Sequence, residues 1–261
     1  MTPLTVGNLR VKETRKLSRR SVRAERRLFL ADGPKALEGA LQAGCVVEVF
    51  ATPDASERYA ALLAPAPAVA LVDDRALASL SDSVTPAGVV AVCSMVDVPP
   101  ETAFAAGGGG PSLVVIAADV REPGNAGTLV RTADALGAGA VVLAGHSVDL
   151  YNPKTVRASV GSVFHLPVAV EPDPRAAVDA AQAAGLVVLA ADGAGELALS
   201  DAGSVLTGPV AWLFGNEAWG LPTELAGLAD HRVRIPISGR AESLNLATAA
   251  AICLYETVRV R

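Results

Sequence analysis

Short apolar runs alternate with helix-forming stretches along the first half of the chain. The apolar runs predict strands at 28–31, 46–51, 69–72 and 89–95, and the intervening stretches predict helices at 34–43, 56–63 and 75–80. Strands alternating with helices of about ten residues are typical of a small α/β domain. We therefore predict an N-terminal α/β domain.

The second half repeats this alternation with more strongly apolar strands. Strands are predicted at 113–118, 140–144, 166–170, 186–191, 211–214 and 233–237, and helices at 125–136, around 154–159, at 174–184 and from 243 to about 258. The run Leu113–Ala118 is apolar at every position, as expected of a strand buried on both faces of a parallel sheet. We predict a C-terminal α/β domain with a parallel sheet.

The last predicted helix carries an apolar stripe. With a start at Ser243, which could act as the N-cap, the stripe runs at three- and four-residue steps through Leu244, Ala247, Ala251, Leu254 and Val258. Such a stripe packs against the helix's own core or against a partner, and the core is the commoner use.

Between the two halves lies a segment rich in proline and glycine. It contains Pro99-Pro100 and four successive glycines at 107–110. We expect nothing there to pack, because such a composition is typical of a flexible connector. The predicted organisation is an N-terminal domain over 1–97, a linker over 98–111 and a second domain over 112–261.

Charge is distributed unevenly along the chain. The net charge is −5, but the segment 10–27 holds nine basic residues against Glu13 and Glu25, so it carries +7 and the remainder −12. Its residues favour a helix that buries little, because Leu17 is its only large apolar side chain between positions 11 and 22. Concentrated positive charge on an acidic protein favours a polyanion partner, and a solvated helix without a partner is the alternative. Composition alone does not distinguish RNA from DNA or an anionic membrane surface.

Other features of the composition narrow the class of protein. No run of about 18 apolar residues occurs, so we expect no membrane span. The N-terminus carries scattered charges where a signal peptide needs an apolar region, which favours a cytoplasmic protein. The three cysteines, Cys45, Cys93 and Cys253, lack the spacing of metal ligands. We expect buried reduced thiols and no metal site.

Three polar clusters each follow a predicted strand. They are Asn125-x-Gly127-x-x-x-Arg131, the tripeptide 215–217 and the tripeptide 243–245. Ligand sites in parallel sheets lie beyond the carboxyl ends of strands. Glycine permits close approach of a substrate, and the guanidinium of Arg131 suits a phosphate or a developing oxyanion. Any one cluster could be a helix cap or a solvated loop, but the three together favour a functional site.

These clusters belong to three longer motifs that resemble those of the SpoU (TrmH-type) RNA 2′-O-ribose methyltransferases. The motifs are Asn125-x-Gly127-x-x-x-Arg131, Leu213-Phe214-Gly215-Asn216-Glu217-x-x-Gly220-Leu221 and Ile235-Pro236-Ile237-x-Gly239-x-x-x-Ser243-Leu244-Asn245. The segment 152–161 is also similar to the rRNA-directed members. The N-terminal part resembles their small RNA-binding domain, itself similar to certain ribosomal proteins, with Asp32-Gly33 where Glu-Gly is usual.

The resemblance implies a deep trefoil knot in the C-terminal domain, a homodimer and bound S-adenosylmethionine. It carries the cofactor contacts over to Ala191, Gly215, Ile235 and Leu244. Each of these lies next to a predicted strand end or helix start, where free backbone groups can read the edge of a buried ligand.

The resemblance also implies Arg131 as the catalytic residue. Because an arginine loses its proton so reluctantly, we expect Arg131 to stabilise developing negative charge and to orient the substrate phosphate rather than to act as a base. Asn125, Glu217, Ser243 and Asn245 would hold Arg131 and the ribose in place. The expected RNA contacts are Arg10, Lys12, Arg15, Lys16, Arg19, Arg20, Lys154 and Arg157.

The expected function is methyl transfer from S-adenosylmethionine to a ribose 2′-hydroxyl. The two-domain layout favours 23S rRNA as substrate, with tRNA as the alternative. A different class of protein, a non-catalytic RNA-binding assembly or resistance factor, would keep the fold but not bind the cofactor. A nucleotide-dependent Rossmann enzyme ranks last, because no Gly-x-Gly-x-x-Gly run follows the first strand of the second domain.

Overall fold

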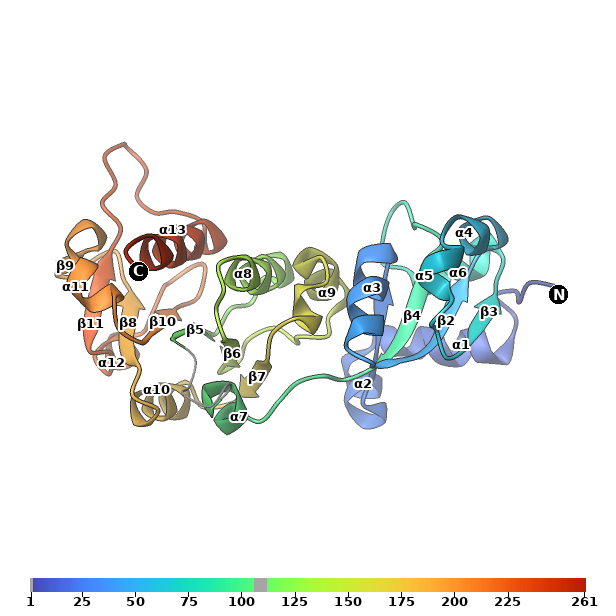
Figure 1. The fold of residues 1–261 in the computed structure, drawn as a ribbon, viewed down its shortest axis with the longest axis horizontal. Coiled ribbons are helices and arrows are strands. Elements are labelled where there is room, and N and C mark those ends of the chain that lie inside the picture. The colour runs from blue at the N-terminus through green and yellow to red at the C-terminus, as the bar shows by residue number, and fades with distance from the viewer. Residues whose placement is uncertain (1, 106–111) are drawn as a thin grey trace. The chain divides into compact units, whose positions relative to one another are not determined.

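The computed structural model describes residues 2–105 and 112–261. They form two compact units (Figure 1), here called the N-terminal unit, Met1–Val96 with Asp149–His165, and the C-terminal unit, Asp97–Val148 with Leu166–Arg261. The segment Asp149–His165 therefore differs from its expected place in the C-terminal domain. Contacts of Tyr151 hold this segment in the N-terminal unit. The centroid of its ring lies 4.5 Å from that of Phe29, and its hydroxyl accepts a hydrogen bond from the Val96 N–H.

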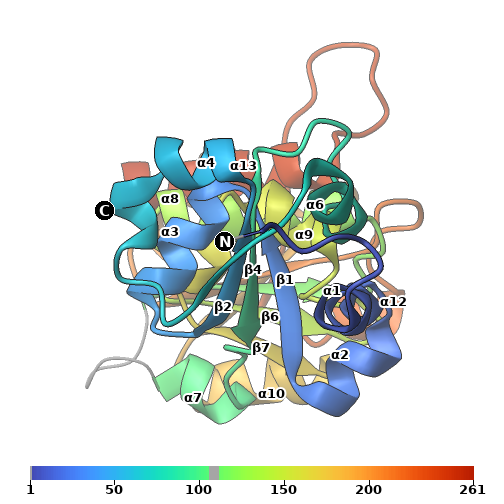
Figure 2. The same cartoon turned by 90° about the vertical axis from the view of Figure 1, so that its right-hand side faces the viewer.

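The N-terminal unit is built on a four-stranded mixed sheet. Its strand order is β1 (Leu28–Asp32), β4 (Val89–Ser94), β2 (Val46–Ala51) and β3 (Val69–Leu71). The first three strands are antiparallel, and β2 and β3 are parallel. Its helical elements are α1 (Leu9–Arg15), η1 (Lys16–Ser18), α2 (Arg20–Arg26), α3 (Pro34–Gln42), α4 (Pro53–Arg58), α5 (Ala60–Leu63), α6 (Asp74–Leu80), α9 (Pro153–Ser159) and η2 (Ser162–Phe164). Helix α3 covers one face of the sheet, and α1 and α2 lie on the other side (Figure 2).

The prediction of one helix over 10–27 is wrong. The segment is divided into α1, η1 and α2, with Arg19 extended at φ −91° and ψ 130°. It also buries more than expected, since Val11 and Leu17 are 1% and 2% exposed in the core beneath it. Side chains six positions apart point roughly 120° apart on a straight α-helix. Between Val11 and Leu17 the chain changes from α1 to the tighter 3-10 turn η1, and both residues face the same core.

The C-terminal unit contains a seven-stranded sheet in which every pair of neighbouring strands is parallel. The order is β7 (Val168–Glu171), β6 (Ala140–Ala144), β5 (Leu113–Ala118), β10 (Val210–Phe214), β8 (Val187–Ala191), β11 (His231–Arg234) and β9 (Leu197–Ala198). All six residues of β5 are buried, as its apolar sequence predicts. The predicted α/β parallel-sheet fold is confirmed, and the trefoil knot stays a prediction.

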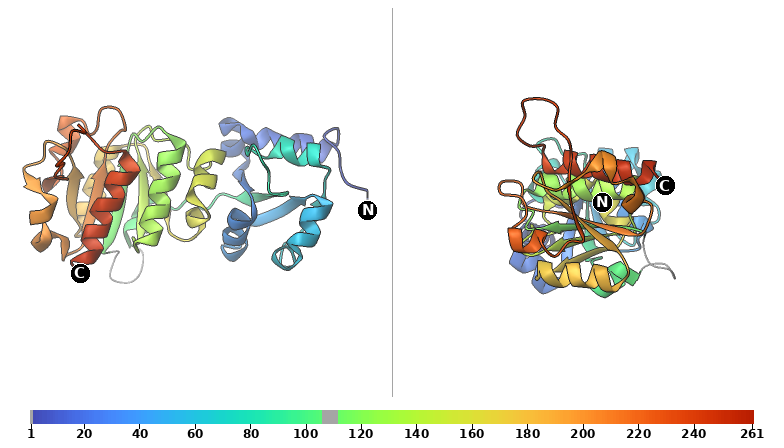
Figure 3. Two further views of the ribbon diagram at one scale, coloured as in Figure 1. Left: turned by 90° about the horizontal axis from the view of Figure 1, so that it is seen from above. Right: turned by 90° about the vertical axis from the view of Figure 1, so that its left-hand side faces the viewer.

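Helices cover both faces of this sheet. They are α7 (Pro100–Ala105), α8 (Pro123–Ala135), α10 (Pro174–Ala183), η3 (Leu199–Asp201), α11 (Gly203–Leu206), α12 (Thr223–Ala226) and α13 (Leu246–Arg259). Helices α8 and α13 lie side by side on one face, and α7 and α10 lie on the other (Figures 1 and 3). Trp212 is fully buried beneath α13, and its indole N–H donates to the Thr257 hydroxyl at 2.9 Å.

The first part of the predicted linker is folded. Helix α7 lies within 98–111, and its Ala103 and Phe104 are buried in the core of the C-terminal unit. The expectation that nothing in this segment packs is therefore wrong for α7, because two apolar side chains suffice to anchor a short helix on the sheet. The four glycines at 107–110 lie outside the described residues.

Helix α13 begins later than predicted. Its N-cap is Asn245 rather than Ser243, and the Asn245 Oδ1 accepts hydrogen bonds from the N–H groups of Ala247 and Thr248. Of the predicted stripe, Ala247 and Leu254 are buried in the chain's own core, whereas Val258 is 43% exposed. Its buried face runs instead through Ala247, Ala250, Cys253, Leu254 and Thr257. Because alanines occupy several neighbouring positions of this helix, hydrophobicity alone does not identify which of its faces is buried.

All three thiols are free. Cys93 and Cys253 are buried, as expected, and Cys45 is half-buried. Burial raises the pKa of Cys253 to about 12, which keeps this thiol protonated at neutral pH. Among residues 2–105 and 112–261, no helix is long and apolar enough to cross a membrane, and no group of three or more histidine, cysteine or acidic side chains could hold a metal ion.

Candidate active site

A cavity of about 370 Å³ lies beyond the carboxyl ends of β8, β10 and β11 in the C-terminal unit. It is lined by Ala191, Asp192, Gly193, Phe214, Gly215, Asn216, Glu217, Ala218, Trp219, Gly220, Val233, Ile235, Ile237, Glu242, Ser243, Leu244, Leu246 and Ala249. The strands end here and the chain turns away from the sheet, which leaves backbone groups available to a ligand. The cavity therefore lies beyond the carboxyl ends of strands, where we expect a ligand site from the sequence.

The loop after β10 is a closed turn that only glycine permits at two positions. A Cβ on Gly215 would lie 2.3 Å from the backbone of Gly220, and Gly220 itself has φ +70°. The backbones of Asn216 and Gly220 donate to each other at 3.0 and 2.9 Å. The Asn216 side chain donates to the Asp119 carbonyl at 2.7 Å and accepts from the Ala218 N–H at 2.8 Å. The loop that carries Glu217 is thus rigidly held.

Residues from all three motifs are joined by hydrogen bonds. The Glu217 carboxylate accepts from the N–H groups of Arg121 (3.1 Å) and Glu122 (3.0 Å) and from the Asn125 amide at 3.2 Å. The Asn245 amide in turn donates to the Asn125 Oδ1 at 3.1 Å. Asn125, Glu217 and Asn245 form one chain of contacts, here called the amide–carboxylate cluster.

Glu217 is held as an anion. Burial raises the pKa of Glu217, but the hydrogen bonds from Arg121, Glu122 and Asn125 outweigh it, so the pKa lies below the usual value. A carboxylate that accepts three hydrogen bonds is a poor base at neutral pH. Its role in the cluster is to fix the orientation of the Asn125 amide.

Two predicted catalytic residues lie outside this cluster. Ser243 lines the cavity, but no described hydrogen bond joins its side chain to Asn125, Glu217 or Asn245. Arg131 is exposed on α8, six residues after Asn125 and roughly 9 Å further along the helix axis. Within the described part of the chain, no hydrogen bond or ion pair restrains the Arg131 guanidinium, which leaves it available to a substrate.

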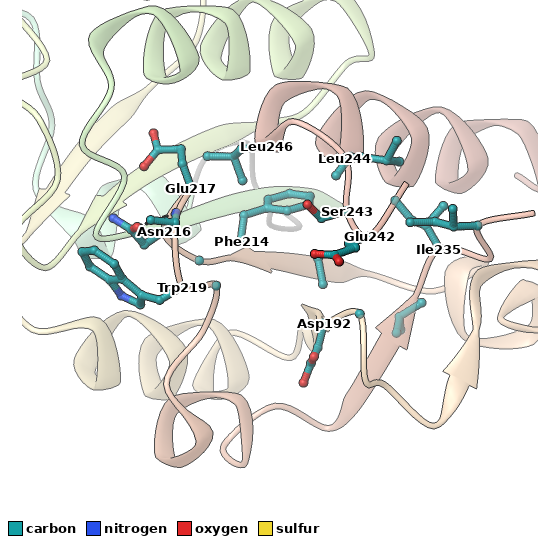
Figure 4. A pocket seen from close by; sticks show the side chains of 18 residues that line it. Asp192, Phe214, Asn216, Glu217, Trp219, Ile235, Glu242, Ser243, Leu244 and Leu246 are labelled. Carbon is teal, nitrogen blue, oxygen red and sulfur yellow. Dashed lines mark hydrogen bonds between the residues drawn. The ribbon is translucent and has the colours of Figure 1, made fainter. Parts of the chain in front are cut away.

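The four predicted cofactor contacts, Ala191, Gly215, Ile235 and Leu244, all line the cavity. Ile235 and Leu244 lie toward one end of it, whereas Glu217 lies toward the other (Figure 4). Ala191, Gly215 and Ile235 lie at the ends of three strands and Leu244 lies shortly before α13, and all four surround one space.

Sequence reasoning missed the acidic character of the cavity. Its charged lining residues are Asp192, Glu217 and Glu242, and no lysine or arginine lines it among the described residues. Asp192 is partly compensated by Arg232, 3.7 Å away. The positions of Asp192, directly after β8, and of Glu242, beside Ser243, were the available signals. An acidic cavity favours a cationic ligand.

These features fit S-adenosylmethionine, which carries a sulfonium and an ammonium group on an apolar and aromatic frame. The cavity volume falls within the range of small-molecule sites, about 300–1,000 Å³. Phe214, Ile235 and Leu244 provide apolar surface, and Asp192 and Glu242 provide negative charge. The residues present therefore suit this cofactor.

A second concavity, of about 510 Å³, lies in the N-terminal unit and is basic. It is lined by Lys12, Arg15, Lys16, Ser18, Arg19 and Ser79. All eight predicted RNA contacts lie in this unit, since Lys154 and Arg157 are on α9. The Arg157 guanidinium donates to the Asp82 carboxylate at 2.9 Å.

The basic residues of this segment fall into two groups. Some are engaged within the protein: Arg10 pairs with Glu48, Lys16 and Arg26 with Glu13, and buried Arg23 with Asp149. By contrast Lys12, Arg15, Arg19 and Arg20 are exposed and form no ion pair among the described residues. We refer to these four as the unpaired cations. Three of them line the basic concavity.

Two family models match the chain. The model of the SpoU rRNA methylase family matches residues 112–255, and the model of the MRM3-like substrate-binding domain matches residues 8–91. Together they cover most of both units.

Individual relatives agree with these matches. The chain is 34% identical over 251 residues to the 23S rRNA (guanosine(2553)-2′-O)-methyltransferase RlmP of Bacillus subtilis, covering 95% of each chain. It is 44% identical over 145 residues to the 23S rRNA (uridine(2479)-2′-O)-methyltransferase of Streptomyces viridochromogenes, a match that spans 54% of this chain and 50% of that relative. The crystal structure of the SpoU methyltransferase AviRb from S. viridochromogenes with AdoMet superposes with a TM-score of 0.85 at 32% identity, covering 97% of this chain and 98% of that one.

Proposed function

The chain belongs to the SpoU family of rRNA methylases, and from that premise we propose that it transfers the methyl group of S-adenosylmethionine to a ribose 2′-hydroxyl of 23S rRNA. The observation that carries the proposal is the amide–carboxylate cluster, which joins the three motifs beside an acidic cavity that suits the cofactor. Both relatives described above are named for 2′-O-methylation of 23S rRNA.

The cavity holds the methyl donor. When bound, S-adenosylmethionine supplies an electrophilic methyl group. The chain's backbone at Ala191, Gly215, Ile235 and Leu244 surrounds that ligand, and Glu242 faces it with negative charge. Because β8, β10 and the closed loop after Gly215 are rigid, these contacts need little rearrangement when the ligand enters.

The amide–carboxylate cluster positions the substrate. Ionised Glu217 fixes the amide of Asn125, and Asn245 fixes the other side of the same group, so both amides are preorganised toward the ribose. Ser243, in the wall of the same cavity, assists this placement. Holding the nucleophile in line with the methyl group provides much of the rate acceleration in such a transfer.

Arg131 stabilises charge rather than removing the proton, which passes to water as the bond between methyl and sulfur breaks and S-adenosylhomocysteine leaves. Its guanidinium remains protonated at neutral pH, and its exposed position on α8 leaves its donors available for the substrate. We assign it the phosphate beside the target ribose and the negative charge that develops on the 2′-oxygen.

The basic concavity attracts the RNA backbone. The unpaired cations provide the dominant, salt-dependent part of this attraction, because Arg10 and Lys16 already interact with carboxylates. Lys154 and Arg157 on α9 extend the same unit's contact with RNA. We further propose a cytoplasmic location, which suits an rRNA substrate.

We also propose a homodimer formed through α13. Ile252, Tyr255 and Val258 are 37%, 60% and 43% exposed, and their three-residue spacing places them on neighbouring positions of one side of the helix. An exposed apolar stripe of this kind favours burial against a second copy of the chain.

The function is tested by incubating the protein with S-adenosylmethionine labelled in its methyl group and unmodified 23S rRNA transcribed in vitro. We expect label in the RNA and one phosphodiester linkage that resists alkaline cleavage, because a methylated 2′-oxygen cannot attack the phosphate. A tRNA transcript treated in parallel should remain unlabelled. Label in tRNA alone would assign the alternative substrate, and calorimetry without S-adenosylmethionine binding would favour a non-catalytic RNA-binding protein.

A further inference from the structure

Trp219 is an exposed aromatic residue on the rim of the cofactor cavity. The residue is 63% exposed, whereas Phe214 and Ala249 in the same cavity wall are buried or half-buried. It lies two positions after Glu217, toward the same end of the cavity as that carboxylate (Figure 4). The indole is therefore presented at the end of the cavity where Glu217 of the amide–carboxylate cluster lies.

The backbone that carries Trp219 is fixed on both sides. On one side, Asn216 closes the turn by its bonds to Gly220 and anchors it to the carbonyl of Asp119. On the other side, Gly220 occupies a conformation with φ +70° that few other residues adopt. An indole on such a loop loses little conformational freedom when a ligand stacks on it, which favours a recognition role.

We propose that Trp219 stacks on the nucleobase of the nucleotide whose ribose is methylated. The inference rests on the proposed function. The ribose must lie between the cluster, which positions it, and the cavity, which holds the methyl donor, and its base is one glycosidic bond away. Proteins recognise unpaired RNA bases by stacking them on aromatic side chains, and every base offers a face for this. Trp219 therefore holds the target nucleotide in place without selecting which base it carries.

Two variants separate stacking from bulk. Trp219→Leu keeps an apolar side chain but removes the aromatic ring, whereas Trp219→Phe keeps a smaller aromatic ring. With unmodified 23S rRNA transcript, we expect Trp219→Leu to lower kcat/KM about tenfold or more and Trp219→Phe to lower it by clearly less. S-adenosylmethionine affinity should be unchanged in both. Equal losses in the two variants, or no loss in Trp219→Leu, would overturn the proposal.

Fluorescence gives a direct second readout. The chain has two tryptophans, and Trp212 is fully buried, so emission accessible to acrylamide reports on Trp219. In protein saturated with S-adenosylhomocysteine, we expect the 23S rRNA transcript to quench this emission and to protect it from acrylamide. Trp219→Phe should abolish that change.

The same measurement distinguishes the other possible partners of the indole. Quenching by S-adenosylhomocysteine alone would assign Trp219 to the adenine of the cofactor, and protection that depends on protein concentration would assign it to a subunit contact. Either result contradicts the proposal. If the wild-type protein methylates no RNA, the proposed function fails, whereas normal methylation together with an unaffected Trp219→Leu variant rejects this inference alone.

Discussion

Glu217 and Arg131 are both charged residues of the candidate site, but their surroundings differ. Glu217 accepts hydrogen bonds from two backbone N–H groups and one amide, whereas Arg131 is exposed on α8. The first is an anion fixed by the protein, and the second is a cation available to a ligand. Substitutions at the two positions should therefore affect different properties.

Replacement of Glu217 by glutamine should reduce stability in a pH-dependent manner. Because the folded-state pKa of Glu217 is lowered, its contribution is present above the unfolded pKa of about 4.5 and is lost as the pH falls through the lower folded value. At pH 7 we expect a cost of about 1 kcal/mol or less, since the carboxylate is largely exposed. Urea unfolding from pH 7 to pH 3 measures this difference, which should shrink on the acid side. Glu242→Gln, in the same cavity wall, is the matched control, and an equal pH trend in both variants would reject the assignment.

Replacement of Arg131 should affect the chemistry and leave the cofactor site intact. We expect Arg131→Ala to lower kcat about 10²- to 10³-fold, because a donor to developing negative charge is lost. Arg131→Lys should restore part of the rate, since it retains the charge but not the planar fork. Steady-state methylation and calorimetry with S-adenosylmethionine provide the two measurements. Arg175→Ala, an exposed arginine on α10, should behave as wild type, and unchanged turnover in Arg131→Ala would refute the role of Arg131.

Asn245 has two functions at the start of an element. Its Oδ1 caps α13, and its Nδ2 donates to Asn125. We expect Asn245→Ala to cost about 1 kcal/mol of unfolding free energy through loss of the cap, and also to lower kcat. Asn245→Asp should keep the cap but lose the donor, so its stability should stay near wild type while its activity falls. Urea unfolding and methylation assays on the same samples test this, and parallel losses in both variants would contradict the division of roles.

In the basic segment 10–27, some arginines form ion pairs within the protein and others are available to bind RNA. Within it, Arg15 and Arg19 are unpaired cations, whereas Arg10 and Arg26 are held by carboxylates. We expect the double change Arg15→Gln and Arg19→Gln to flatten the dependence of log K for RNA on log salt concentration by about 1.5. Arg10→Gln with Arg26→Gln removes the same charge from the same segment and should flatten it less. Filter binding of 23S rRNA transcript at several salt concentrations gives both slopes, and equal slopes would show that only net charge matters.

At the scale of the whole molecule, the exposed side of α13 leads to a prediction about assembly. We expect Ile252→Asp with Tyr255→Asp to shift the light-scattering mass of the protein from two chains to one, because charges cannot be buried in an apolar contact. Val84→Asp, at a fully exposed position of the N-terminal unit, should leave the mass unchanged. A single-chain mass for the wild-type protein would reject the homodimer.

Much of the fold could be predicted because its determinants are local. The buried strand β5 shows its place in the parallel sheet by its six apolar residues, and the SpoU family prediction, made from three short motifs, is confirmed. Three other features could not be predicted. Helix α7 depends on contacts with a core formed elsewhere in the chain, and the N-cap Asn245 also contacts Asn125, 120 positions away. The break at Arg19 lies in a segment that packs on the core of the N-terminal unit through Val11 and Leu17.

By itself the sequence determined the family and the type of reaction, because motif residues and their spacing are properties of short segments. The tertiary structure alone decided which of these residues act together. Asn125 and Asn245 are 120 positions apart and meet only because α8 and α13 lie side by side on one face of the sheet. Likewise, only folding distinguishes the paired arginines from the unpaired ones, because the carboxylate that neutralises a guanidinium can come from a distant position in the sequence.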